Sequence, residues 1–167
     1  MVGTEFRISC GAVVFYGPPA SDDSSSAEND RVLLIKNDDD KTKWFIPKGG
    51  IEGGESMQKA AMREVYEEAG VPCIVDTSAE PIGVQVRPGP IIFSRGGMPN
   101  PTPHTKIVIF FMGLRNTSKL DQVRPSEEGL IMRWAKIDEV KDVLSKRDFK
   151  IIDEALRIRS IQQQSVQ

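Results

Sequence analysis

The chain has 167 residues, 39% of them hydrophobic, a length that closes one sizeable core but is short for two. Its 22 Lys and Arg against 24 Asp and Glu give a formal net charge of -2, a balance that does not favour a nucleic-acid-binding protein. Cys10 and Cys73 form no Cys-x-x-Cys pair and there is one histidine, so neither a zinc site nor a disulfide scaffold is supported. We expect a single domain over residues 1–167 that attracts a polyanion only through a local patch.

The sequence predicts neither a membrane span nor a signal peptide at the N-terminus. No window is apolar enough to span a bilayer and no signal peptide is visible, so we expect a cytoplasmic protein, although an export signal removed from the natural N-terminus would leave no trace. Residues 1–6 contain Gly-Thr and Glu-Phe, dipeptides that cloning sites commonly encode. We further expect a flexible loop at 17–30, rich in Ser, Pro and Asp, and a frayed tail at 163–167.

The first third of the chain predicts three strands. Residues 7–15 and 31–36 are rich in β-branched and small apolar residues, and 44–47 is a short apolar run that ends at Pro47. Asp38, Asp39 and Asp40 lie between the second and third strands without a fourth oxygen ligand at fixed spacing. We therefore interpret them as a solvated hairpin tip.

A helix is predicted over residues 57–69. Ser56 is a suitable N-cap, Gly70 is a suitable C-terminal glycine, and Met57, Ala61 and Val65 recur every four residues as an apolar face. Before it, residues 48–55 carry four glycines, which permit an irregular loop. The order strand, glycine-rich loop, helix places this loop beside the helix N-terminus.

Downstream, strands are expected near 81–87, 106–114 and 130–137, followed by helices at 138–146 and 148–162. The Pro- and Gly-rich stretch 88–105 is too long for a simple connector and is typical of a binding element. The pattern contains no internal repeat.

Carboxylates are concentrated on the helix at 57–69. Glu64, Glu67 and Glu68 stand at i, i+3 and i+4, so they share one face, which we expect to point away from the apolar stripe. Like charges there repel, and Arg63 can neutralise only part of the cluster by reaching Glu67 at i+4. Magnesium would supply the rest, since it binds through one or two carboxylates while keeping water and phosphate ligands. Taken alone, the pattern is also that of a solvated acidic helix face.

The surrounding residues favour the metal site. The segment 49–71 reads Gly49-x5-Glu55-x7-Arg63-Glu64-Val65-x-Glu67-Glu68-x-Gly70-Val71 and matches every fixed position of the Nudix box. The chain therefore resembles the Nudix hydrolases. The resemblance implies an α+β fold, an α/β/α sandwich with a mixed β-sheet between helices, in which the box lines the active site.

The resemblance also implies residue roles. Glu64 and Glu68 would be metal ligands, Glu67 a ligand or the general base, and Arg63 would orient Glu67 by a salt bridge. Glu55 would fix the loop or hold a metal through water, and Gly49 with Lys48 would place a backbone carbonyl near the ion. The implied cofactor is Mg²⁺, for which Mn²⁺ can substitute. Glu127 or Glu128 could instead supply the base, as a carboxylate outside the box does in some subfamilies.

The sequence around the box resembles the diphosphoinositol polyphosphate phosphohydrolase branch, which also cleaves diadenosine polyphosphates. The resemblance rests on residues 44–52, Glu55-Ser56 and Ala60-Ala61. It implies a small polyphosphorylated substrate bound by basic and polar residues from distant parts of the chain. The candidates are Arg7, Ser9, Lys43, Lys48, His104, Lys106, Lys146 and Arg147.

Two other function classes stay open. A nucleotide-pool, ADP-ribose or RNA-cap Nudix pyrophosphatase would need an aromatic clamp for the base, and the two tryptophans lie on apolar strands. A catalytically dead Nudix domain that only binds ligand is disfavoured because every acidic position of the box is present. No membrane or stable nucleic-acid partner is expected. The preferred phosphate, the preferred substrate within the branch and the oligomeric state are not determined by these patterns.

Overall fold

A computed structural model describes residues 5–17, 30–39, 43–88 and 104–164. The predicted loop at 17–30 therefore falls largely outside the described residues, as does the stretch 89–103. No helix of the described chain has the length and apolar character needed to cross a membrane.

The sheet of the described chain is mixed. Its strands run in the order β4-β6-β1-β2-β7, while β3 pairs with β1 and β5 pairs with β6. The pairing of β1 with β6 is parallel and the others are antiparallel. The strands are β1 (Glu5–Phe15), β2 (Arg31–Asn37), β3 (Lys48–Gly50), β4 (Cys73–Ile74), β5 (Gly83–Pro88), β6 (His104–Arg115) and β7 (Leu130–Lys136).

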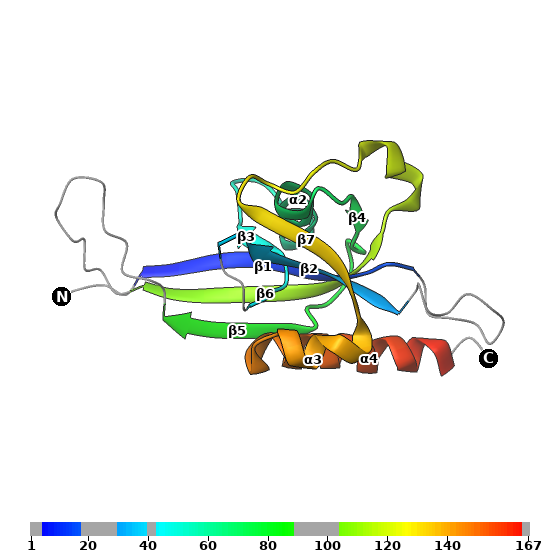
Figure 1. The fold of residues 1–167 in the computed structure, drawn as a ribbon. Coiled ribbons are helices and arrows are strands. Elements are labelled where there is room, and N and C mark those ends of the chain that lie inside the picture. The colour runs from blue at the N-terminus through cyan, green and yellow to red at the C-terminus, as the bar shows by residue number, and fades with distance from the viewer. Residues whose placement is uncertain (1–4, 18–29, 40–42, 89–103, 165–167) are drawn as a thin grey trace.

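Helices cover both faces of this sheet (Figure 1). On one face, alternate residues of β1, namely Cys10, Ala12 and Val14, pack in a core with α2 (Met57–Ala69). On the other face, Val13 and Phe15 pack with α3 (Val140–Val143) and α4 (Lys146–Gln164). The prediction of an α/β/α sandwich with a mixed sheet is thus confirmed.

The helix α2 begins and ends where its capping residues predict. The Ser56 hydroxyl accepts a hydrogen bond from the Lys59 backbone N–H at 3.2 Å, and Gly70 ends the helix in the left-handed region at φ 70°. The predicted stripe was wrong at Met57, which is 38% exposed, whereas Ala61 and Val65 are buried. A strict four-residue spacing drifts by about 40° per step around a helix of 3.6 residues per turn, so Met57 turns away from the core.

Several element boundaries differ from prediction. Residues 44–47 form only isolated bridges at Trp44 and Phe45, and the strand β3 begins after Pro47, because β1 offers its edge to Lys48–Gly50. The helix predicted at 138–146 is a 3-10 turn, η2 (Ile137–Glu139), followed by the four-residue α3, and it ends at Leu144 in extended backbone. The strand β4 and the 3-10 helix η1 (Thr117–Gln122) were not predicted.

The C-terminal helix is longer than predicted at both ends. Lys146 and Arg147 were expected before the last helix but form its first turn, because the Ser145 hydroxyl accepts from the Asp148 backbone N–H and caps it. The helix α4 includes residues 163–164 of the predicted frayed tail, and residues 165–167 lie outside the described chain.

Candidate active site

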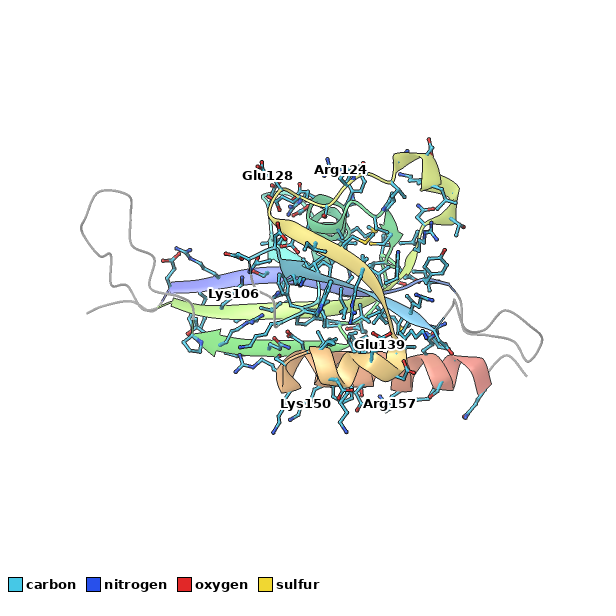
Figure 2. The ribbon with its side chains drawn as sticks, in the orientation of Figure 1. Lys106, Arg124, Glu128, Glu139, Lys150 and Arg157 are labelled. Atoms are coloured by element: carbon cyan, nitrogen blue, oxygen red, sulfur yellow. The ribbon has the colours of Figure 1, made fainter. Side chains whose placement is uncertain are left out.

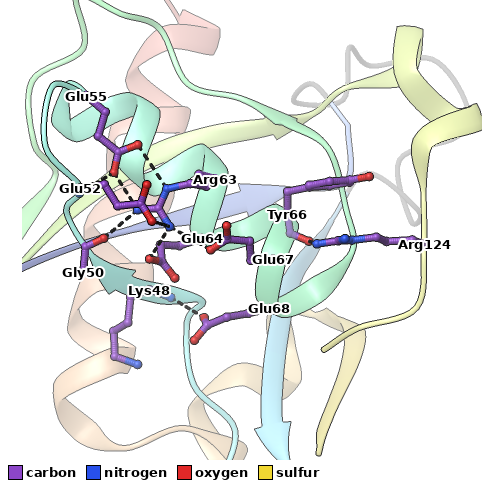
Figure 3. A network of polar contacts seen from close by, with 10 residues as sticks. All are labelled: Lys48, Gly50, Glu52, Glu55, Arg63, Glu64, Tyr66, Glu67, Glu68 and Arg124. Carbon is purple, nitrogen blue, oxygen red and sulfur yellow. Dashed lines mark hydrogen bonds and ion pairs between the residues drawn. The ribbon is translucent and has the colours of Figure 1, made fainter. Parts of the chain in front are cut away.

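Arg63 binds the carboxylates that surround it (Figure 3). Its Nη1 donates to Glu64 Oε1 and to Glu67 Oε2, both at 2.8 Å. Its Nη2 donates to Glu55 Oε1 and to the Gly50 carbonyl, both at 2.7 Å. The planar fork of the guanidinium therefore joins α2 to the loop that precedes it.

The hydrogen bonds between Arg63 and the carboxylates shift the pKa values of both partners. The hydrogen bonds from Arg63 hold the pKa of Glu55 below its ordinary value, and the carboxylates in turn raise the pKa of Arg63. Glu55 also accepts from the Glu52 backbone N–H at 2.8 Å. It thus closes the glycine-rich loop, one of the roles predicted for it.

Glu64 and Glu68 are more buried than the prediction of a common outward face allows. Glu64 is 9% exposed and belongs to the buried side of α2, so that expectation was wrong for this residue. Burial raises the pKa of Glu64 above its ordinary value. Glu68 accepts a hydrogen bond from the Lys48 backbone N–H at 2.7 Å, and burial raises its pKa despite that bond.

The Glu64 carboxylate occupies the space that a side chain at position 49 would need, so only glycine fits there. A β-carbon built at Gly49 would overlap the Glu64 carboxylate. The backbone of β3 therefore passes directly against the acidic face of α2 at Gly49. This close approach places Gly49 and Lys48 beside Glu64 and Glu68, where the sequence predicted a backbone ligand.

A cleft of about 480 Å³ opens over these carboxylates. One wall is α2, and the other is the segment between η1 and β7, whose Glu127 backbone N–H donates to the Glu68 carbonyl at 3.2 Å. Arg124 stacks over the Tyr66 ring at 4.3 Å to its centroid. The cleft is lined by Glu64, Glu67, Glu68, Arg124, Pro125, Ser126 and Glu127.

The donor set suits magnesium. Four carboxylates line one open cleft, and burial raises the pKa values of Glu64 and Glu68 there, so a bound cation would stabilise their charged forms. In the described chain no three His, Cys, Asp or Glu side chains converge to hold a metal ion between them. Magnesium needs no such cluster, since it takes one or two carboxylates and completes its shell with water and phosphate.

Basic residues lie on the other side of β3. On the α4 face of the sheet, Arg7 of β1 stands beside Lys106 of β6, which stands beside Arg87 of β5. Lys48 points to the same face, opposite Gly11, and burial lowers its pKa, to which Arg87 and Lys106 add. The structure thus brings three predicted residues, Arg7, Lys48 and Lys106, to one region, and adds Arg87.

The other predicted substrate residues are placed less uniformly. Ser9 is buried on the same face as Arg7. Lys146 and Arg147 are exposed at the start of α4, where the Arg147 carbonyl accepts from Gln85 of β5 at 3.1 Å. Lys43 is exposed beside Trp44, near the end of α3. His104 begins β6, but its side chain lies outside the described part.

Arg87 was not singled out from the sequence. The only local signal is its place two residues after Gln85 and four after Gly83, which puts all three on one face of a strand. That signal could not reveal its neighbours, because they come from β6, β1 and β3.

The carboxylate cleft and the glycine-rich loop have the arrangement expected for the Nudix box, and the NUDIX domain matches residues 26–155. The chain belongs to the Nudix family. Over 40 residues it is 50% identical to diphosphoinositol polyphosphate phosphohydrolase 3-alpha of Mus musculus, an alignment that covers 24% of this chain and 24% of that protein. The chain thus aligns with about a quarter of that relative's length.

Two solved structures share the fold. A Nudix hydrolase from Nitrosomonas europaea superposes with a TM-score of 0.59 at 22% identity, covering 92% of this chain and 90% of that one. A binary complex of the C. elegans Ap4A hydrolase gives 0.59 at 18% identity, covering 92% and 98%. At such identities the likeness concerns the fold alone.

The raised pKa of Glu68 predicts a pH-dependent stability of the metal-free Nudix protein. Burial raises the pKa of Glu68 from 4.5 to about 7, so the native state binds a proton more tightly than the unfolded chain. This contribution is fully present below pH 4.5 and is lost as the pH rises through about 7. We expect Glu68→Gln to stabilise the protein relative to wild type at pH 8, by on the order of 2 kcal/mol, and much less at pH 5.

Urea unfolding of both proteins in EDTA at the two pH values measures this difference. The Glu68→Gln comparison cancels the contribution of carboxylates that do not interact with Glu68, since these titrate equally in both proteins. A stability difference that is the same at pH 5 and pH 8 would contradict the prediction.

Proposed function

We propose that this protein is a magnesium-dependent Nudix hydrolase that cleaves a phosphoanhydride bond in inositol pyrophosphates, with diadenosine polyphosphates as second substrates. The observation that carries the proposal is the juxtaposition of two charged regions at Lys48. Its backbone N–H donates to Glu68 of the acidic cleft at 2.7 Å, whereas its side chain lies on the α4 face of the sheet, the face that also carries Arg87 and Lys106. A metal site for the reacting phosphate thus adjoins a cationic surface for other phosphates.

The chemistry assigned to the cleft follows from its donors. Bound Mg²⁺, held by Glu64 and Glu68, would neutralise phosphate oxygens and lower the pKa of the attacking water. The water oxygen forms a bond to phosphorus, its proton passes to a carboxylate, and the bridging P–O bond breaks to release the leaving phosphate. Arg63 holds Glu67 in place at 2.8 Å through this step.

Two carboxylates are candidates for the base. Glu67 is exposed and positioned by Arg63, while Glu127 lines the same cleft on the opposite wall. Replacing the base by Gln should lower kcat far more than replacing the other residue, with little change in KM. Glu128 does not line the cleft, so Glu128→Gln serves as the control.

The substrate branch is supported by charge and by the aromatic residues. The local identity with the mouse diphosphoinositol polyphosphate phosphohydrolase covers only 24% of the chain, so it supports the branch weakly. Both tryptophans are engaged within the protein: Arg133 and Lys36 lie over Trp44, and Trp134 packs against Tyr16. Neither ring is free to clamp a base, which argues against a nucleotide or RNA-cap substrate.

A substrate panel tests the proposal. Purified protein with Mg²⁺ is offered inositol pyrophosphates, diadenosine polyphosphates, ADP-ribose and capped RNA, and the products are identified. We expect the highest kcat/KM for inositol pyrophosphates. Efficient cleavage of ADP-ribose or capped RNA with inositol pyrophosphates left intact would overturn the substrate assignment while leaving the Nudix chemistry in place.

Lys48 and Lys106 should separate these substrates. Lys48→Met and Lys106→Met keep the aliphatic stems but remove the cations, and each should raise KM for inositol pyrophosphate by about tenfold, because charge-assisted hydrogen bonds are lost. The effect on any ADP-ribose cleavage should be much smaller, and added salt should raise KM more steeply for the inositol substrate. Equal effects on both substrates would refute the prediction.

A further inference from the structure

Three cations form a transverse row on the α4 face of the sheet. Arg7, Lys106 and Arg87 occupy paired positions of β1, β6 and β5, so their side chains leave the same face of three adjacent strands. We call these three residues the cationic row. Since neighbouring strands lie about 4.8 Å apart, the row brings three positive charges within about 10 Å at the level of the backbone.

Arg87 differs from Arg7 in its burial and pairing. Its Nε and Nη2 atoms are buried and have no hydrogen-bond partner among the described residues. Arg7, by contrast, is half-exposed and its Nε donates to Glu5 at 3.0 Å. A buried guanidinium without an acceptor costs free energy unless something else supplies one.

Nε and Nη2 of Arg133 are also buried without a hydrogen-bond partner, but other contacts stabilise this guanidinium. Its guanidinium lies over the Trp44 ring, 4.5 Å from the centroid, and approaches Glu139 at 3.4 Å. Within the part of the chain that the structure describes, Arg87 has neither an ion pair nor an aromatic neighbour of this kind. The connection from β5 to β6, residues 89–103, contains Arg95 and no Asp or Glu.

The surroundings of Arg87 are connected to the acidic cleft. Arg87 and Lys106 both act on the side chain of Lys48, opposed by the buried Asp148 of α4 and by Glu68. Asp148 is itself bonded to Gln85, two residues before Arg87, at 3.1 Å. Asp148 and Glu68 are thus the two negative charges identified near the cations of Lys48, Lys106 and Arg87.

We propose that Arg87 is a specificity-determining residue that, together with Lys106 and Arg7, binds substrate phosphates away from the bond that is cleaved. This inference rests on the proposed function of the cleft and deepens it. The fork of Arg87 can donate two parallel hydrogen bonds to one phosphate, which supplies the acceptors that its Nε and Nη2 lack. The row selects compact polyanions, because phosphates on adjacent carbons of one ring can reach closely spaced cations at the same time.

Extended substrates gain less from the row. ADP-ribose carries its two phosphates next to each other in the middle of the molecule, so once they occupy the acidic cleft no further phosphate remains for Arg87. The contribution of Arg87 should therefore depend on the number of phosphates that lie outside the cleaved bond. This dependence distinguishes a specificity residue from one that only supports the fold.

The test measures binding without turnover. The probe is inositol hexakisphosphate, titrated calorimetrically in EDTA into wild type, Arg87→Gln, Arg87→Lys and Arg157→Gln. The last is the charge-matched control, since Arg157 is exposed on α4, pairs with Glu154 at 2.6 Å and lies well apart from Lys106 in Figure 2. We expect Arg87→Gln to weaken binding by about tenfold or more, Arg87→Lys by less, and Arg157→Gln by less than about twofold.

Thermal unfolding provides the second readout. Removing an uncompensated cation should leave the Tm of Arg87→Gln unchanged or raise it, whereas a structural role would lower it. Equal losses of probe affinity in Arg87→Gln and Arg157→Gln, or a lowered Tm, would overturn the inference. If wild type and Arg87→Gln cleave inositol pyrophosphates equally well, the inference about Arg87 is overturned and the proposed function is retained. Probe binding that depends on Arg87 in a protein that does not cleave inositol pyrophosphates would instead contradict only the proposed function.

Discussion

Replacing Glu64 or Glu68 by Gln is expected to lower kcat by about a thousandfold or more while the protein remains folded. Both carboxylates line the cleft, and each is held next to β3, Glu64 against Gly49 and Glu68 by the Lys48 N–H. Gln keeps the shape of the side chain but removes the charge that binds a divalent cation. Steady-state kinetics in saturating Mg²⁺, with circular dichroism as the check on folding, measures the effect.

The exposed Glu80, between β4 and β5, provides the matched control. Glu80→Gln removes the same charge away from the cleft and should leave kcat unchanged. Chelation should stop turnover in the wild type, and Mg²⁺ or Mn²⁺ should restore it. A folded Glu64→Gln protein with activity near that of the wild type would exclude Glu64 as a metal ligand.

Replacing Arg63 by Ala is expected to reduce both activity and stability. The guanidinium donates to Glu55, Glu64, Glu67 and the Gly50 carbonyl, and its side chain is 22% exposed. Its loss leaves a cluster of carboxylates without their counter-charge, so the free energy of unfolding in EDTA should fall by about 2 to 4 kcal/mol. The kcat should fall by about a hundredfold, since Glu67 and the loop lose their position.

Arg63→Lys separates charge from geometry. A lysine keeps the positive charge but cannot bridge three carboxylates and a carbonyl, so it should recover part of the stability and little of the activity. Mg²⁺ should narrow the stability difference between Arg63→Ala and wild type, because the cation takes over part of the neutralisation. Chemical unfolding with and without Mg²⁺ measures both effects, and an Arg63→Ala protein within about 0.5 kcal/mol of wild type in EDTA would show that the network contributes little.

Some elements of this fold depend on local causes and others on long-range causes. The helix α2 was predicted to the residue because its determinants are neighbours in sequence: Ser56 caps one end and Gly70 the other. The strand β3 was misplaced because its existence depends on the edge of β1, from Ser9 to Gly11, and no property of Lys48-Gly49-Gly50 alone favours a strand. The helix predicted at 138–146 was wrong in length: Val140, Val143 and Leu144 reach the core from a single α-helical turn, after which Leu144 is extended.

The sequence by itself determined the family pattern and the acidic half of the site. Glu64, Glu67, Glu68 and Arg63 lie within one helix, so their spacing already fixes which of them are neighbours. Only the tertiary structure decided how this helix meets the rest of the chain: that Glu64 is buried against Gly49, and that Lys48 lies on the same face of the sheet as Arg87 and Lys106. The physical reason is that strand register sets these contacts. Register depends on the pairing of whole strands and on the burial of their faces, which no local stretch of sequence determines.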